Sequence, residues 1–72
     1  MAGKRSKTDI INDYNSGVVF YNKKDYSHSI VQFGEALESE PNNMQYKMAL
    51  ANSCNNRGVM LYEGKNYKKA AE

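Results

Sequence analysis

Apolar residues recur at steps of three and four along most of the chain, which is the pattern of helices that bury one face. The first such stretch runs from about residue 7 to 22. Its start is marked by Ser6 and Asp9, three residues apart, a spacing typical of the capping box that begins a helix. A second stretch, from about 26 to 39, follows Asp25, which is a favoured N-cap residue. The pattern therefore predicts two helices joined by a short turn.

A third helix is predicted from about residue 43 to 63, and it is longer than the other two. Pro41 separates it from the second helix, because the residue before a proline avoids helical geometry. Its main stripe advances by alternating steps of four and three: Met44, Met48, Ala51, Asn55, Gly58 and Tyr62. Gly64 fits the left-handed position that ends many helices, and a fourth helix is expected from about 67 to 72. The fold class that follows is all-α, built from antiparallel helical hairpins.

Composition limits the size and class of the protein. The chain has 72 residues, of which 40% are hydrophobic, and this allows one small domain near the lower limit of independent stability. Residues 1–7 carry positive charges without apolar periodicity, so we expect a flexible basic tail before a helical domain at 8–72. The net charge of +2 is too small to indicate a nucleic-acid partner. The longest apolar run is far too short for a membrane span.

Residues that carry chemistry are few. The chain has one cysteine, Cys54, and one histidine, His28, so it can form neither an internal disulfide nor a Cys/His zinc site. Missing disulfides are typical of a reducing compartment, and we expect a cytoplasmic protein. Cys54 has apolar neighbours at helical spacing and is predicted to be a small core residue, whereas His28 is predicted to be exposed. We expect no catalytic residue, cofactor or metal, and therefore no enzyme.

Two segments of the chain resemble each other. Residues 17–26 read GVVFYNKKDY and residues 58–67 read GVMLYEGKNY, at a distance of 41 residues. Self-similarity at such a period indicates stacked helical hairpins. Gly17 and Gly58 are each expected to remove a side chain where two helices cross, with Ser29 as the small partner of the first.

The first copy resembles the tetratricopeptide repeat. That family has an aromatic, a small residue, a Phe, an Ala and a Pro at fixed distances after a small residue. Counted from Gly17, these positions hold Phe20, Ser29, Phe33, Ala36 and Pro41. The second copy matches at Gly58, Leu61, Tyr62, Asn66, Tyr67 and Ala70. The resemblance covers about residues 10–72 and implies a fragment of a right-handed α-solenoid, but the period exceeds the usual 34 residues by seven, which lengthens the third helix.

The resemblance also implies a function. In that family one stripe of each repeat's first helix lines a concave groove that binds extended or helical peptides. The corresponding residues are Ile11, Tyr14, Val18, Tyr21, Asn52, Asn55, Val59 and Tyr62. The tyrosines could instead pack between helices, and the asparagines could simply meet solvent. We expect a non-catalytic protein–protein interaction module, an adaptor or scaffold; the alternative is a self-associating unit whose apolar stripes form an oligomer or domain-swapped interface.

Overall fold

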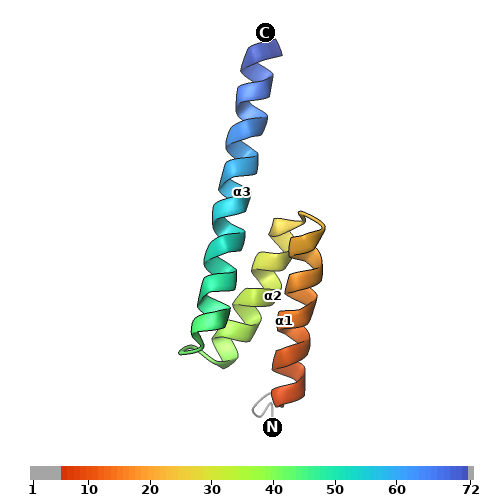
Figure 1. Cartoon of the computed structure of the whole chain (residues 1–72), viewed down its shortest axis with the longest axis vertical. Helices are drawn as coiled ribbons and strands as arrows, with labels where there is room; N and C mark the ends of the chain where they lie inside the picture. Colours follow the sequence, from red (N-terminus) through yellow and green to blue (C-terminus); the bar gives the residue numbers. More distant parts are fainter. Residues whose placement is uncertain (1–5, 72) are drawn as a thin grey trace.

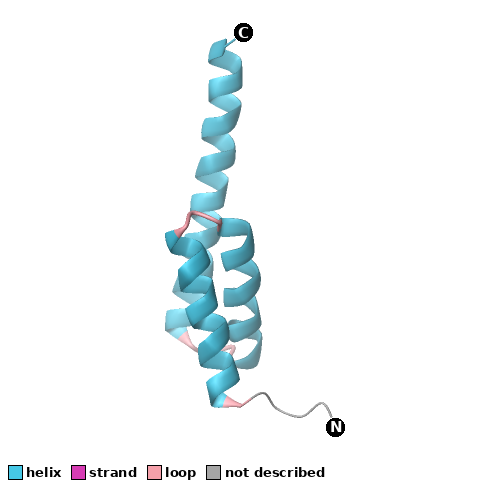
Figure 2. Cartoon of the chain, turned by 90° about the vertical axis from the view of Figure 1, so that its right-hand side faces the viewer, coloured by secondary structure: helices cyan, strands magenta, loops and turns pink. Residues whose placement is uncertain are grey.

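The chain forms three helices in a computed structural model that describes residues 6–71, with side chains described for 6–64 (Figure 1). They are α1 (Lys7–Asn22), α2 (Tyr26–Ser39) and α3 (Met44–Ala71). α1 and α2 form an antiparallel hairpin, and α3 packs against α2. The second half of α3 extends well past the hairpin, as Figure 2 also shows at right angles. The fold is therefore all-α with a long third helix, as the sequence predicted, and its described part contains no strand.

Each helix begins at a polar cap. The side chains of Ser6, Asp25 and Asn43 accept hydrogen bonds from backbone N–H groups three residues further on, at 3.1, 3.3 and 3.1 Å. Such bonds satisfy donors that have no partner within the helix. In the turn between α1 and α2, Lys24 adopts a left-handed conformation with φ of 64°. These local features explain why the predicted bounds 7–22 and 26–39 are correct.

The predicted end of the third helix is wrong. The helix begins at Met44, after the cap residue Asn43, and is continuous to residue 63 as expected. α3 then runs through Gly64 to Ala71, where a turn and a fourth helix at 67–72 were predicted. No described glycine has a positive φ, so Gly64 keeps right-handed geometry. Glycine permits the left-handed conformation without imposing it, and the lysines and alanines that follow are strong helix formers. Of the predicted basic tail, residues 1–5 lie outside the described residues and Lys7 begins α1.

The core lies where the three helices meet. Its buried apolar residues are Ile10, Phe33, Ala36 and Tyr46. Two partly buried side chains, Tyr14 and Leu37, pack against it. On α3 the core continues through Ser53, which is fully buried. Cys54 comes next and is exposed, so the prediction of a core cysteine is wrong. One residue advances a helix by about 100°, which turns the thiol away from α2.

The two repeat glycines lie in different surroundings. A Cβ atom on Gly17 would lie 2.5 Å from two ring atoms of Phe33, so this glycine is a close-packing position as predicted. A Cβ on Gly58 would meet nothing within 4 Å, and the prediction for this residue is wrong. The reason is that no helix crosses α3 there: every described residue from Arg57 to Gly64 is exposed.

Candidate functional site

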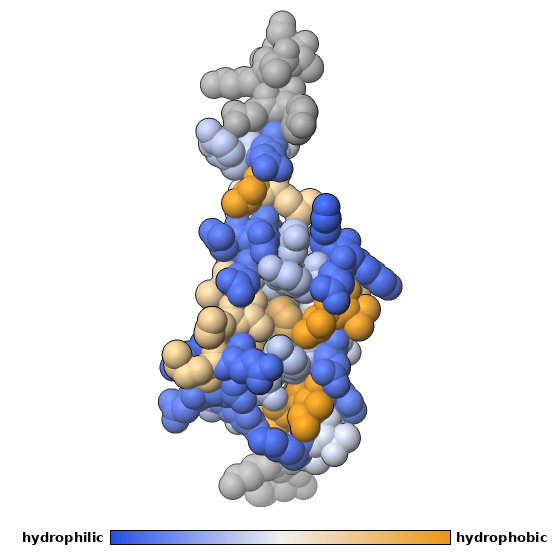
Figure 3. All heavy atoms as spheres, viewed as in Figure 1, coloured by the Kyte–Doolittle hydropathy of each residue, from blue (hydrophilic) through white to orange (hydrophobic). Residues whose placement is uncertain are grey.

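A groove of about 310 Å³ lies between α1 and α3. α2 packs against both helices, and its buried Phe33 forms part of the groove floor. The lining residues are Tyr14, Val18, Tyr21, Phe33, Gln45, Met48, Ala49 and Asn52. Among these described residues the surface is aromatic, aliphatic or amide, and no side chain carries a full charge. Figure 3 shows this face of the molecule, where tan and orange apolar residues alternate with blue polar ones.

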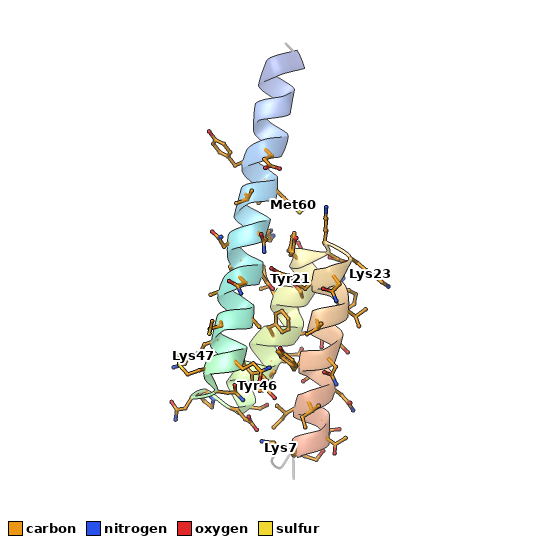
Figure 4. All side chains as sticks on the ribbon, viewed as in Figure 1. Lys7, Tyr21, Lys23, Tyr46, Lys47 and Met60 are labelled. Carbon is orange, nitrogen blue, oxygen red and sulfur yellow. The ribbon has the colours of Figure 1, made fainter. Side chains whose placement is uncertain are left out.

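Two side-chain hydrogen bonds join α3 to α1 along the groove. Gln45 Nε2 donates to Tyr14 Oη at 3.1 Å, and Asn56 Nδ2 donates to Tyr21 Oη at 2.7 Å. Figure 4 shows Tyr21 on α1, on the side that faces α3. A phenolic oxygen that accepts a hydrogen bond still has its own proton to donate. Both phenolic O–H groups therefore keep the capacity to donate a hydrogen bond.

Ring contacts hold the same tyrosines in place. Tyr14 stacks on Tyr46 with centroids 5.1 Å apart and lies tilted against Phe33 at 5.5 Å. Tyr21 meets Tyr26 edge-on at 5.3 Å. Both groove tyrosines are half-buried, so each packs with one part of its ring and exposes another part to the groove. Both tyrosines therefore pack between helices and also line the groove.

The eight residues predicted to bind a partner do not form one site. Tyr14, Val18, Tyr21 and Asn52 line the groove. Asn55, Val59 and Tyr62 line a second, shallower hollow of about 580 Å³ along the exposed part of α3. Ile11 is 41% exposed on α1 and lines neither. The split follows from helix geometry, because three residues rotate Asn55 by about 60° from Asn52, and Asn55 then lies on the side of α3 opposite to the buried Ser53.

Three groove residues on α3 were missed by the sequence prediction. They are Gln45, Met48 and Ala49. They lie seven, four and three residues before Asn52, the spacings at which a helix face repeats. Because Asn52 was among the predicted binding residues, its helical spacing to these three residues could have identified them.

Two polar side-chain pairs lie beyond the groove. At the turn after α1, His28 Nδ1 lies 2.8 Å from the Asp25 carboxylate, and its ring stacks on Phe20. The hydrogen bond from His28 lowers the pKa of Asp25 below its ordinary value. Near the start of α1, Lys7 pairs with Glu40 at 3.1 Å. The pKa of Glu40 is lowered first by a hydrogen bond from the Asn43 amide and then by Lys7. His28 is exposed, as predicted.

Across residues 6–64 no three His, Cys, Asp or Glu side chains gather closely enough to hold a metal ion. In the same part of the chain, no helix has both the length and the hydropathy needed to cross a membrane. Comparison with protein-family models, with curated proteins and with solved structures found no match to this chain. The fold and groove define a small all-α protein with a helical-repeat-like arrangement.

Proposed function

We propose that this chain is a non-catalytic protein–protein interaction module of the tetratricopeptide-repeat type. It acts as an adaptor or scaffold and holds a peptide or a partner helix in the groove between α1 and α3. The observation that supports this proposal is the composition of the groove: Tyr14, Val18 and Tyr21, which the resemblance assigns to a binding surface, share it with Asn52 of the next repeat. A location in the reducing cytoplasm accords with the single cysteine and is part of the proposal.

The groove suits an uncharged, partly apolar segment. Val18 and the ring faces of the tyrosines offer apolar contact, and Met48, which is 61% exposed, has a flexible side chain that adapts to irregular partners. The tyrosine hydroxyl groups and the amide of Asn52 can pair with backbone carbonyl and N–H groups of a peptide. The volume of about 310 Å³ lies at the lower end of ligand sites, which fits a short anchor segment.

Adjacent valines on α1 provide a matched test. Val18 lines the groove, whereas Val19 is 51% exposed outside it. Peptides selected from a displayed library would be titrated into labelled protein while backbone amide signals are followed by NMR. Val18→Asp should weaken binding about tenfold or more, a loss of at least 1.4 kcal/mol, and Val19→Asp should leave it unchanged. Circular dichroism checks that both variants remain helical.

The same titration can contradict the proposal. Signal changes that cluster away from Tyr14, Val18 and Asn52 would place the binding surface elsewhere. Equal peptide affinities of the Val18→Asp and Val19→Asp variants would also place the binding surface elsewhere. The alternative function, self-association, depends on a different face of α3.

A further inference from the structure

α3 carries a stripe of exposed residues on the side opposite to α2. The fully buried Ser53 marks the side that packs on α2. At about 100° per residue, the stripe lies roughly 140–180° around the helix from Ser53. Its members, which we call the α3 seam, are Met44, Met48, Ala51, Asn55, Gly58 and Tyr62. All six are exposed, and within the described residues no other helix covers them.

The spacing of the seam is that of a coiled coil. Its steps of four and three average 3.5 residues, the heptad period that keeps one stripe facing a partner helix. Asn55 is the single polar member, and one polar residue in such a stripe sets register at a cost in stability. Ala51 and Gly58 are small, and a Cβ on Gly58 would meet nothing within 4 Å, so a second helix can approach closely there.

The apolar surface around the seam is large for so small a chain. Of the exposed large apolar side chains, five lie on or beside the seam, and their exposure ranges from 45% to 67%: Met44, Met48, Val59, Leu61 and Tyr62. At roughly 150–200 Å² for a fully exposed side chain of this size, they present on the order of 500 Å² per copy. Two copies would cover about 1,000 Å², the lower limit of a specific interface. This area fits a weak, reversible dimer.

We propose that two copies of this chain associate through their α3 seams as an antiparallel coiled coil. In the register that pairs the whole seam, Met44 faces Tyr62, Met48 faces Gly58, and Ala51 faces Asn55 of the second copy. Bulky Met48 then lies over the space left by a glycine, as close packing requires. A parallel arrangement would pair Gly58 with Gly58 and Ala51 with Ala51, and both layers would leave gaps. Antiparallel helix dipoles add to the preference.

The antiparallel register gives Cys54 a defined place. Its two-fold axis passes near residue 53 of both helices, so the exposed Cys54 lies beside Cys54 of the second copy. In a parallel coiled coil the two thiols would lie on opposite flanks. Cross-linking through Cys54 can therefore distinguish an antiparallel from a parallel arrangement of the two α3 helices.

The seam and the peptide groove are separate surfaces that share Met48 at their border. Gln45, Ala49 and Asn52 point about 40–100° away from Ser53, and the seam lies beyond them. The dimer would therefore cover the groove along its α3 border, at Met48, and not at Tyr14, Val18 and Tyr21 on α1. This inference does not depend on the proposed peptide binding, and its test contains no peptide.

Sedimentation velocity from about 10 µM to 1 mM tests the association, because weak dimers dissociate in this range. The mass is expected to rise from 8.2 kDa towards twice that value. At high concentration, the short cross-linker bismaleimidoethane should join the chains through Cys54. Gly58→Glu should abolish both the rise in mass and the cross-link, since the new carboxylate would face Met48 of the second copy. Gly34→Glu on α2 is the matched control, because a Cβ there also meets nothing within 4 Å, and it should preserve both.

Three outcomes would overturn the proposal. A chain that stays monomeric at about 1 mM would exclude a second copy as the occupant and leave the seam to a helix of another kind. A dimer that persists in Gly58→Glu would use another surface. A dimer that the cross-linker fails to join would not be antiparallel in this register. Helical circular dichroism of both glycine variants ensures that a lost dimer does not reflect a lost fold.

Discussion

Gly17 of α1 and Phe33 of α2 approach each other so closely that a Cβ atom on residue 17 would lie 2.5 Å from ring atoms Cδ1 and Cε1. The contact lies at the centre of the hairpin, because Phe33 is 98% buried, with 2% of its surface exposed, and also lines the groove floor. The glycine therefore determines how near α1 lies to α2, and through Phe33 it shapes the groove.

Alanine at the two repeat glycines should change stability in opposite directions. Gly17→Ala forces the Phe33 ring to move, and overpacking of this kind costs about 1–3 kcal/mol, more than the helix propensity that alanine gains. Gly58→Ala adds a methyl group in open space and should gain about 0.5–1 kcal/mol. Thermal unfolding at about 10 µM, below the range expected for dimers, measures both. Equal shifts in the two variants would contradict the assigned packing.

This pair of glycines also shows what sequence could and could not reveal. The bounds of α1 and α2 were predictable because their caps, Ser6 and Asp25, act within a few residues. The groove residues of α1 were predictable because helical spacing fixes one face. The environment of Gly58 was not, since it depends on whether another helix crosses α3. Local similarity between the two copies cannot supply that tertiary partner, and Cys54 was misplaced for the same reason.

The hydrogen bond from Asn56 to Tyr21 should contribute measurably to stability. It spans α1 and α3 at 2.7 Å, and both residues are half-buried. Tyr21→Phe removes the acceptor and leaves the amide without this partner, and we expect a loss of about 0.5–1.5 kcal/mol. Unfolding in urea, monitored by circular dichroism, measures the change in the free energy of unfolding.

A double-mutant cycle isolates this bond. The cycle compares the single variants Tyr21→Phe and Asn56→Ala with the double variant that carries both changes. The stability losses of the two single variants should sum to more than the loss of the double variant, because each single change already breaks the bond. Tyr62→Phe is the control, since Tyr62 is 67% exposed and lies outside the groove. Strictly additive losses would show that the bond contributes nothing to folding.

Ser53 should tolerate alanine and reject larger residues. It is fully buried on α3, and its Oγ has no hydrogen-bond partner. A buried hydroxyl without a partner pays a desolvation cost, so Ser53→Ala should leave stability unchanged or raise it by about 1 kcal/mol. Ser53→Leu should lower it by about 1–3 kcal/mol, because α3 would be pushed from α2. The unfolding midpoints of the two variants test these expectations. A destabilised Ser53→Ala variant would indicate that the hydroxyl has a hydrogen-bond partner in solution.

Acid should weaken the fold partly through Asp25. The hydrogen bond with His28 lowers the pKa of this carboxyl in the folded chain, with smaller help from the backbone N–H of His28. A carboxyl whose pKa is depressed by folding contributes stability above its unfolded value, about 4, and loses that contribution as the pH falls through the lower folded value. Stability should therefore decline below about pH 4 as this group takes up a proton.

Asp25→Asn tests this directly, because asparagine is an equally good N-cap but does not titrate. The variant should show a smaller loss of unfolding midpoint between about pH 5 and pH 2 than the native chain. Glu40→Gln should remove a second part of the same dependence, since the pKa of Glu40 is also lowered, by Asn43 and Lys7. His28→Ala removes the first cause of the Asp25 shift and should resemble Asp25→Asn. If the native chain and Asp25→Asn lose stability in parallel throughout this range, the carboxyl has no folding-dependent pKa and the contact with His28 does not stabilise its charged form.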